Sequence, residues 1–166
     1  MNFLKAEAND VPEIMALYKE VIKTTFTTWD ENYPSADLIK SDIDDGNFYV
    51  LKTDDGKIVA ASFLGVKKDD AEHWFHTLSK PMGVARICVS RLQQGKGVGT
   101  AFMKMLIDEA KRRGVDGMHF HVCTKNSSAI KMYEKCGFVR YGEVVEQYGF
   151  EFFKYEPNRE IFEEEE

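Results

Sequence analysis

A glycine-rich junction between two regular segments constrains the fold of this chain most strongly. Residues 84–90 (VARICVS) are apolar and rich in β-branched residues, which predicts a strand. Apolar residues then recur at helical spacing over 98–110, which predicts a helix. Between the two segments, Gly95, Gly97 and Gly99 permit a positive φ and a close approach of the backbone to a ligand.

The junction has the character of an anion site. The first-turn amides of a helix are not used by its own hydrogen bonds, and together with the helix dipole they favour a phosphate. Lys96 adds a cation beside them. The alternative is that the glycines only shape a turn, because short glycine patterns recur by chance.

Composition bounds the class of protein. A chain of 166 residues, 43% hydrophobic and 13% aromatic, fits one packed domain, and it has no run of roughly 20 apolar residues that would span a bilayer. We expect the domain over 1–157 and a solvated acidic tail over 158–166. Outside the terminal glutamates the charges nearly balance, which argues against a nucleic-acid binder. The N-terminus lacks a signal-peptide pattern, so a cytoplasmic location is expected.

The three cysteines are odd in number and lack CxxC spacing, so reduced thiols are expected in place of disulfides or a zinc site.

The remaining patterns predict an α/β (α+β) fold with a mixed central sheet of about seven strands flanked by helices. Capping residues and an early proline mark a helix start at 9–13, Ser35 can cap a second helix to about Ile43, and the Asp-Gly of residues 54–57 predicts a hairpin. Residues 67–82 are interpreted as a surface loop. The other expected strands cover 3–8, 48–53, 58–66, 118–123, 138–145 and 148–156, and a last helix covers 126–136.

Two motifs in this order resemble the GNAT superfamily of N-acetyltransferases over nearly the whole chain. The first is Gln94-x-x-Gly97-x-Gly99, and the second is NSSAIKMYEKCGF, in which Tyr133 follows Asn126 by seven residues. The resemblance implies a single-domain GNAT fold, with acetyl-CoA as co-substrate in a cleft between two splayed strands, 87–89 and 119–123. No metal is expected.

The resemblance also implies a role for each matched residue. Asn126 and Tyr133, two helical turns apart, should share one face; Asn126 would contact the pantetheine region, and Tyr133 would protonate the departing thiolate, although a tyrosine at such a position can also be core. The backbone groups expected to bind pantetheine are those of Ile87, Cys88 and Val89. The amides expected to bind the pyrophosphate are those of Gln94, Gly95, Lys96, Gly97, Val98, Gly99 and Thr100.

The implied reaction is direct attack of a neutral amine on the thioester, so Cys88 and Cys123 are not expected to act as nucleophiles. The general base is in doubt, because Gly83 occupies the place where some relatives carry a glutamate. His119 and His121 share a strand face and are core or surface histidines, a proton relay, or part of a metal site that lacks further ligands. Weaker candidates for the base are Glu72, His73 and His76.

Arg86 is a cation in an otherwise apolar strand, so it is expected either to form a structural ion pair or to bind a carboxylate of the acceptor. Phe26, Trp29 and Tyr33 lie where the family has its acceptor-side loop, and they either shape an amine pocket or pack in the core.

The favoured interpretation is an N-acetyltransferase for a small-molecule or amino-acid-like amine. Protein acceptors stay open, and no nucleic acid or membrane partner is expected. The alternative within the fold is a non-catalytic acyl-CoA sensor. A dinucleotide-binding oxidoreductase is disfavoured, because Asp116 precedes the strand at 118–123, after which the ribose-binding acid should follow. The aromatic strand pair 138–145 and 148–156 could join two subunits in a homodimer.

Overall fold

The computed structural model describes residues 1–66, 81–115, 117–157 and 162. Its helices and strands follow the predicted order, with two short 3-10 helices in addition. Seven strands form one mixed sheet in the order β1-β2-β3-β4-β5-β7-β6, which confirms the predicted fold class. The chain divides into two compact units, one of Met1–Leu64 with Ala85–Phe102 and one of Gly65–Val84 with Met103–Glu166, so β4 and α3 each contribute to both.

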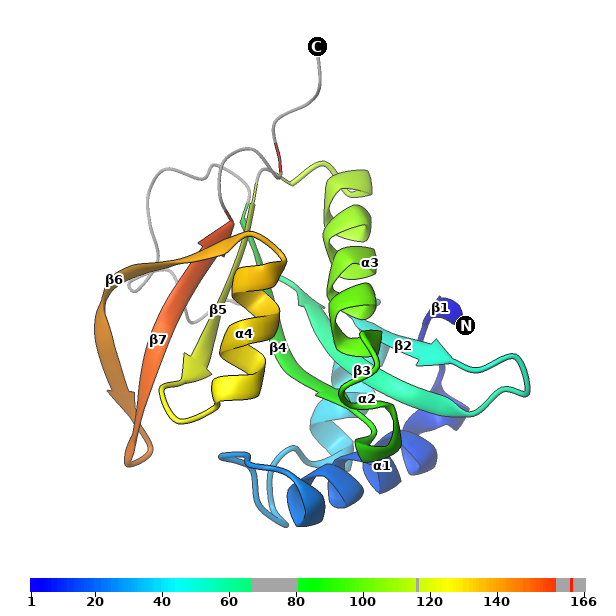
Figure 1. Cartoon of the computed structure of the whole chain (residues 1–166). Helices are drawn as coiled ribbons and strands as arrows, with labels where there is room; N and C mark the ends of the chain where they lie inside the picture. Colours follow the sequence, from blue (N-terminus) through cyan, green and yellow to red (C-terminus); the bar gives the residue numbers. More distant parts are fainter. Residues whose placement is uncertain (67–80, 116, 158–161, 163–166) are drawn as a thin grey trace. The chain divides into compact units, whose positions relative to one another are not determined.

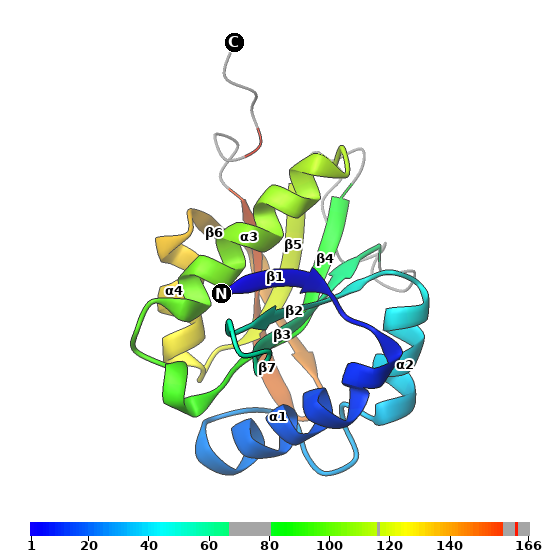
Figure 2. The same ribbon diagram turned by 90° about the vertical axis from the view of Figure 1, so that its right-hand side faces the viewer.

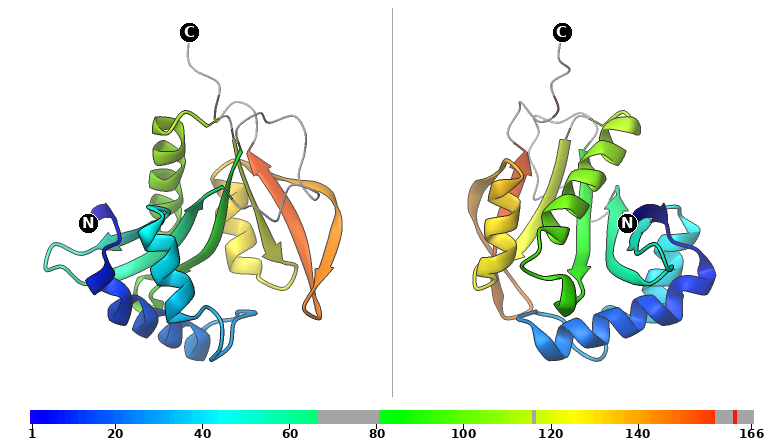
Figure 3. Two further views of the ribbon diagram at one scale, coloured as in Figure 1. Left: turned by 180° about the vertical axis from the view of Figure 1, so that it is seen from behind. Right: turned by 45° about the vertical axis from the view of Figure 1, so that its right-hand side comes forward.

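The first unit combines an antiparallel part of the sheet with two helices (Figure 2). In the left view of Figure 3, α2 lies in front of β2 and β3. The elements of this unit are β1 (Asn2–Lys5), α1 (Val11–Thr24), α2 (Ala36–Asp44), β2 (Phe48–Lys52), β3 (Ile58–Gly65) and the second part of β4 (Pro81–Val89).

Local sequence signals explain where these elements begin. Ser35 accepts a hydrogen bond from the amide of Leu38 and so caps α2, as predicted. Pro12 lies in the first turn of α1, where its missing N–H costs nothing. Gly56 has a φ of +87° in the turn between β2 and β3, which confirms the predicted hairpin.

The core of the first unit lies between the two helices and the sheet. Apolar residues of α1 and α2 pack against β2, β3 and β4, and the edge-on contact of Tyr18 with Trp29 closes one side at a centroid distance of 5.3 Å. On the other sheet face, Phe3 stacks on Tyr49 at 5.1 Å. The buried members of the core are Ala6, Ile14, Leu17, Tyr18, Val21, Ile39, Phe48, Val50, Ile58, Ala61, Phe63 and Cys88.

The second unit holds the C-terminal strands and α4, which lies along β5 and β7 in Figure 1. β4 pairs with β5 in parallel, with Pro81–Gly83 opposite Gly117–His119, and β7 pairs antiparallel with both β5 and β6. Four aromatic side chains form its centre: Phe120, Tyr133, Phe138 and Tyr155. The elements are α3 (Val98–Arg112), β5 (Gly117–Cys123), α4 (Ser127–Lys135), β6 (Phe138–Gln147) and β7 (Phe150–Pro157).

Three predicted boundaries are wrong. β1 ends at Lys5, because Ala8–Asp10 forms a 3-10 helix in which Asp10 accepts the amide of Glu7 at 2.8 Å. β4 begins at Pro81, so the end of the expected loop is strand, while residues 67–80 lie outside the described part. Tyr148 and Gly149, with φ of +54° and +81°, form the turn between β6 and β7, where Tyr148 was expected in a strand.

The predicted tail at 158–166 lies outside the described residues except for residue 162. In the part of the chain that the structure describes, none of the helices combines the length and the apolar character required to cross a bilayer.

Candidate functional site

The glycine turn opens directly into α3. Gly95 and Gly97 have φ of +75° and +79°, a backbone conformation that glycine adopts without strain. A Cβ atom added at either position would meet no heavy atom within 4 Å. The positive φ values therefore favour glycine at both positions. The space beside each glycine is open. Gly97 also accepts the amide of Ala101 at 3.0 Å, which is the first hydrogen bond of the helix.

The Gln94 side chain closes the turn that precedes this junction. Its Nε2 donates to the carbonyl of Val89 at 3.1 Å, and its backbone amide donates to the carbonyl of Arg91 at 3.2 Å. Gln94 thus joins the end of β4 to the beginning of the glycine turn. The motif suggested Gln94 as a cofactor-binding residue, but it did not reveal this internal contact.

The strand segment 87–89 does not present a reactive thiol. Cys88 is buried in the core of the first unit, whereas Ile87 and Val89 are half-buried. Burial raises the pKa of the Cys88 thiol far above its ordinary value, so the thiolate is scarce at neutral pH. The structure therefore supports the expectation that Cys88 is not a nucleophile.

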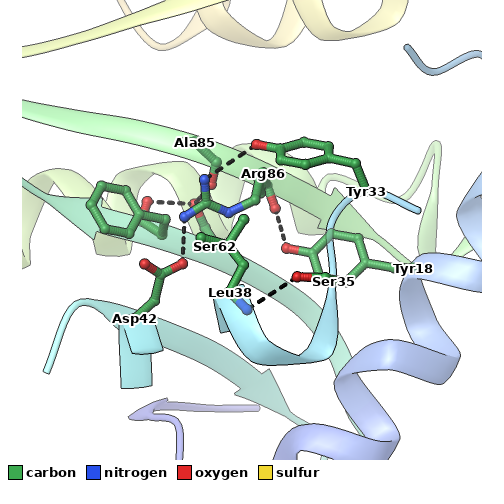
Figure 4. A network of polar contacts seen from close by, with 9 residues as sticks. Tyr18, Tyr33, Ser35, Leu38, Asp42, Ser62, Ala85 and Arg86 are labelled. Atoms are coloured by element: carbon green, nitrogen blue, oxygen red, sulfur yellow. Dashed lines mark hydrogen bonds and ion pairs between the residues drawn. The ribbon is translucent and has the colours of Figure 1, made fainter. Parts of the chain in front are cut away.

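Arg86 contacts four side chains from different parts of the first unit (Figure 4). Its guanidinium forms an ion pair with Asp42 of α2, and Nη1 donates to the Tyr33 hydroxyl at 3.4 Å. Its carbonyl accepts from the Tyr18 hydroxyl at 2.5 Å. The guanidinium also lies over the Phe63 ring, 5.0 Å from its centroid. The structural ion pair, one of the two expected roles, is present.

The backbone of Arg86 explains why so many contacts gather there. Its φ is +54°, a left-handed conformation that is strained for a residue with a Cβ. Such a conformation persists only where its surroundings determine it, and Tyr18 and Asp42 hold the two ends of this residue. These contacts therefore hold a departure from extended backbone in β4 immediately before Ile87.

The aromatic residues of the loop between α1 and α2 differ in exposure. Trp29 is partly buried and packs on the core, which is the packing alternative considered for it. Phe26 and Tyr33 are 46% and 44% exposed. Tyr33 thus combines an exposed ring with a hydroxyl that contacts Arg86.

Asn126 and Tyr133 belong to α4 in the second unit. Asn126 is the N-cap residue of α4, and its Oδ1 accepts the amide of Ala129 at 3.3 Å. Tyr133 is 4% exposed, and its ring lies 4.1 Å from that of Phe120. Burial raises the pKa of Tyr133 well above its ordinary value, so the phenol is protonated throughout the neutral range.

The second unit also contains a pocket of about 350 Å³ at the carboxyl end of β5. Two of the residues that line it, Thr124 and Lys125, directly precede Asn126 in the chain. The residues that line it are Cys123, Thr124, Lys125, Glu146, Gly149, Phe150 and Glu151.

The histidines considered as bases lie on β5. His119 is buried opposite Gly83 in the parallel pair, and His121 is half-buried near Phe152, at a ring distance of 6.2 Å. Glu72, His73 and His76 lie outside the described residues. Within the described ranges, no group of three or more His, Cys, Asp or Glu residues is arranged to hold a metal ion.

The first unit thus contains Trp29, Tyr33, Arg86 and the two segments expected to bind the cofactor, 87–89 and 94–100, while the second contains Asn126 and Tyr133. Sequence reasoning missed Tyr18, Asp42 and Glu20, which contact β4 or the turn after it. The one available signal was the position of Asp42, three residues after Ile39 on the buried face of α2.

Comparison with known proteins identifies the family of this chain. Residues 14–138 match the model of the acetyltransferase (GNAT) family. The [ribosomal protein bS18]-alanine N-acetyltransferase of Escherichia coli is 33% identical over 86 residues, 52% of this chain and 51% of that protein. An uncharacterised N-acetyltransferase of Bacillus subtilis is 36% identical over 56 residues, 34% of this chain and 23% of that protein. The chain therefore spans about half or less of the length of these curated relatives.

Solved structures match over more of the chain. A GNAT-family acetyltransferase of Streptococcus agalactiae has a TM-score of 0.79 at 23% identity, covering 99% of this chain and 96% of that one. The structure of yncA from Salmonella typhimurium, which contains its cofactor acetyl-CoA, has a TM-score of 0.74 at 19% identity, covering 96% and 94%. These likenesses establish the fold. Because the family model matches residues 14–138, which are most of this chain, the chain belongs to the GNAT family of acetyltransferases.

Proposed function

We propose that this chain is an acetyl-CoA-dependent N-acetyltransferase that acts on a primary amine. The observation that carries the proposal is the glycine turn before α3, where two glycines with positive φ leave open space in front of the helix. A helix N-terminus with this surrounding favours a phosphate group, and acetyl-CoA carries a pyrophosphate. Membership of the acetyltransferase family supports the same assignment.

In this proposal the backbone of Ile87, Cys88 and Val89 binds the pantetheine amides, and the amides of residues 94–100 bind the pyrophosphate. The neutral amine nitrogen attacks the thioester carbonyl, the carbon–sulfur bond breaks, and the thiolate takes the proton of the Tyr133 hydroxyl; the proton that the nitrogen loses passes to water and restores the Tyr133 phenol. The assignment of Tyr133 rests on the family motif, and its phenol is protonated at neutral pH, as a general acid must be. The raised pKa of Cys88 supports direct transfer without an acetylated enzyme.

We propose a small-molecule or amino-acid-like amine as the acceptor. The name of the Escherichia coli relative gives an alanine of ribosomal protein bS18 as its acceptor, so a peptide that begins with alanine belongs among the compounds tested. The carboxylate-binding role considered for Arg86 is less favoured, because Asp42 already neutralises the guanidinium. A cytoplasmic location and a homodimer stay predictions from the sequence.

Calorimetry with acetyl-CoA, followed by a panel of amines with detection of free CoA thiol, tests this function. Binding together with acceptor-dependent thiol release would establish the acetyltransferase and identify its acceptor class. Binding without release from any amine or peptide would favour the acyl-CoA sensor. No binding by the wild-type protein would refute the proposal.

A further inference from the structure

Glu20 of α1 contacts the segment that leads to the glycine turn. Its Oε1 accepts from the Ser90 hydroxyl at 3.0 Å and from the Arg91 amide at 3.2 Å, and its Oε2 lies 3.3 Å from the same hydroxyl. Ser90 is only 4% exposed, so these contacts lie at the edge of the core. One carboxylate therefore joins α1 to a turn about 70 residues further along the chain.

The helix α1 gives no reason of its own for an acidic residue at position 20. It lies near the C-terminal end of the helix, where the macrodipole disfavours an anion and where Lys23 is the residue that the dipole favours. Its partner is the start of the 3-10 helix η2 (Arg91–Gln93), whose N-cap residue Ser90 makes no capping hydrogen bond with its own side chain. Glu20 supplies the missing acceptor from another element.

The turn that Glu20 contacts is connected by hydrogen bonds up to the first glycine. The Ser90 amide donates to the carbonyl of Val59 on β3 at 2.8 Å, and its carbonyl accepts the amide of Gln93 at 2.9 Å. The Arg91 carbonyl accepts the amide of Gln94 at 3.2 Å. Both residues that Glu20 holds are thus acceptors for the residues just before Gly95, and fixing them fixes where the glycine turn begins.

We infer that Glu20 is a positioning residue for the pyrophosphate-binding turn of residues 94–99. It acts through Ser90 and Arg91 and does not touch the cofactor. The inference rests on the proposed function, because the turn matters to binding only if it receives the pyrophosphate of acetyl-CoA. Loss of the carboxylate would leave the helix and the glycines in place but let the turn move, so affinity for acetyl-CoA would fall.

Glu13 offers a matched control on the same helix. It is seven residues before Glu20, and its carboxylate also accepts a backbone amide, that of Ile58 at 2.9 Å at the beginning of β3. Glu13→Ala therefore removes a comparable contact between α1 and the sheet, but not one to the turn. Glu20→Gln keeps an oxygen for the Arg91 amide and an amide group that can donate to the Ser90 hydroxyl.

The test measures the Kd for acetyl-CoA by calorimetry, the free energy of unfolding in urea, and amide hydrogen exchange over residues 91–99 in the ligand-free protein. Glu20→Ala should weaken binding about threefold to tenfold, the effect of one lost hydrogen-bonded contact, and should speed exchange in this segment. Glu20→Gln should restore both, and Glu13→Ala should change neither.

Equal Kd values for Glu20→Ala and Glu13→Ala, with equal exchange over 91–99, would overturn the inference. So would a Glu20→Gln protein that binds as weakly as Glu20→Ala. If Glu20→Ala does not fold, Ser90→Ala removes two of the contacts and must show weaker binding and faster exchange in its place. A wild-type protein that does not bind acetyl-CoA would refute the proposed function, while hydrogen exchange would still decide whether Glu20 orders the turn.

Discussion

Replacing Asp42 with alanine removes the carboxylate that faces the Arg86 guanidinium. The two side chains are only 11% and 9% exposed, so water cannot take the place of the lost partner without opening the core. The contacts with the Tyr33 hydroxyl and the Phe63 ring persist, but neither carries a full negative charge. The variant should therefore keep a buried cation without a counterion.

The expected cost follows from this burial. Removing one partner of a buried ion pair costs about 3–5 kcal/mol, because the remaining charge is left uncompensated. The Phe63 contact offsets part of the loss, which places the expected value at about 3 kcal/mol. For a chain of this length, that corresponds to a fall in the melting temperature of roughly 6–12 °C.

Urea unfolding of the wild-type and variant proteins, with the slope and the midpoint fitted separately, measures the change. Asp44→Ala is the control, since it makes the same substitution at an exposed position of α2 and should lie within about 0.5 kcal/mol of wild type. The double variant Asp42→Ala/Arg86→Met removes both charges and keeps the volume at position 86, so it should recover most of the loss. An Asp42→Ala protein as stable as the control, or a double variant no more stable than the single one, would refute the reasoning.

Three further outcomes are expected. Gly97→Val should abolish measurable acetyl-CoA binding, because a β-branched residue is strained at a φ of +79° and its side chain would fill the open space, and retained tight binding would contradict the phosphate-site interpretation. Tyr133→Phe should lower kcat at least about tenfold with little change in the Kd for acetyl-CoA, whereas an unchanged kcat would assign Tyr133 to packing alone. The hydrogen bond that Lys52 Nζ donates to the Asp10 carboxylate raises the pKa of Lys52 above its ordinary 10.5, so the contribution of this pair to stability is complete below pH 10.5 and is lost as the pH rises through the higher folded value. Lys52→Met should therefore be less stable than wild type below pH 10.5 and approach it as the pH rises above 10.5, and a pH-independent difference in unfolding free energy would argue against the ion pair.

Much of the fold could be predicted because its signals are local. The Ser35 cap, the Asp-Gly turn before β3 and the helical spacing after Gly97 each depend on a few neighbouring residues, and all three match the structure. The turn at Tyr148 was missed because its first residue is not a type that usually adopts a positive φ. The early end of β1 was missed because Asp10 turns back to the amide of Glu7, which an apolar pattern does not record.

The glycine motif and the residues Asn126 and Tyr133 were identified from the sequence, since they follow a family pattern at fixed spacing. The hydrogen bonds that the motif residues make within the protein could not be predicted in this way. Asn126 caps α4, and the Gln94 side chain reaches back to Val89; both contacts depend on the path of the backbone and not on residue spacing alone.

By itself, the sequence determined the order of strands and helices, the positions that require glycine and the family to which the chain belongs. Only the tertiary structure decided which charges hold the strand before the glycine turn. Asp42 reaches Arg86 across 44 residues, and Glu20 reaches Arg91 across 71. The physical reason is that periodicity and capping act within one or two turns of a residue, whereas a buried ion pair or a carboxylate that caps a distant helix exists only once the sheet has brought the segments together.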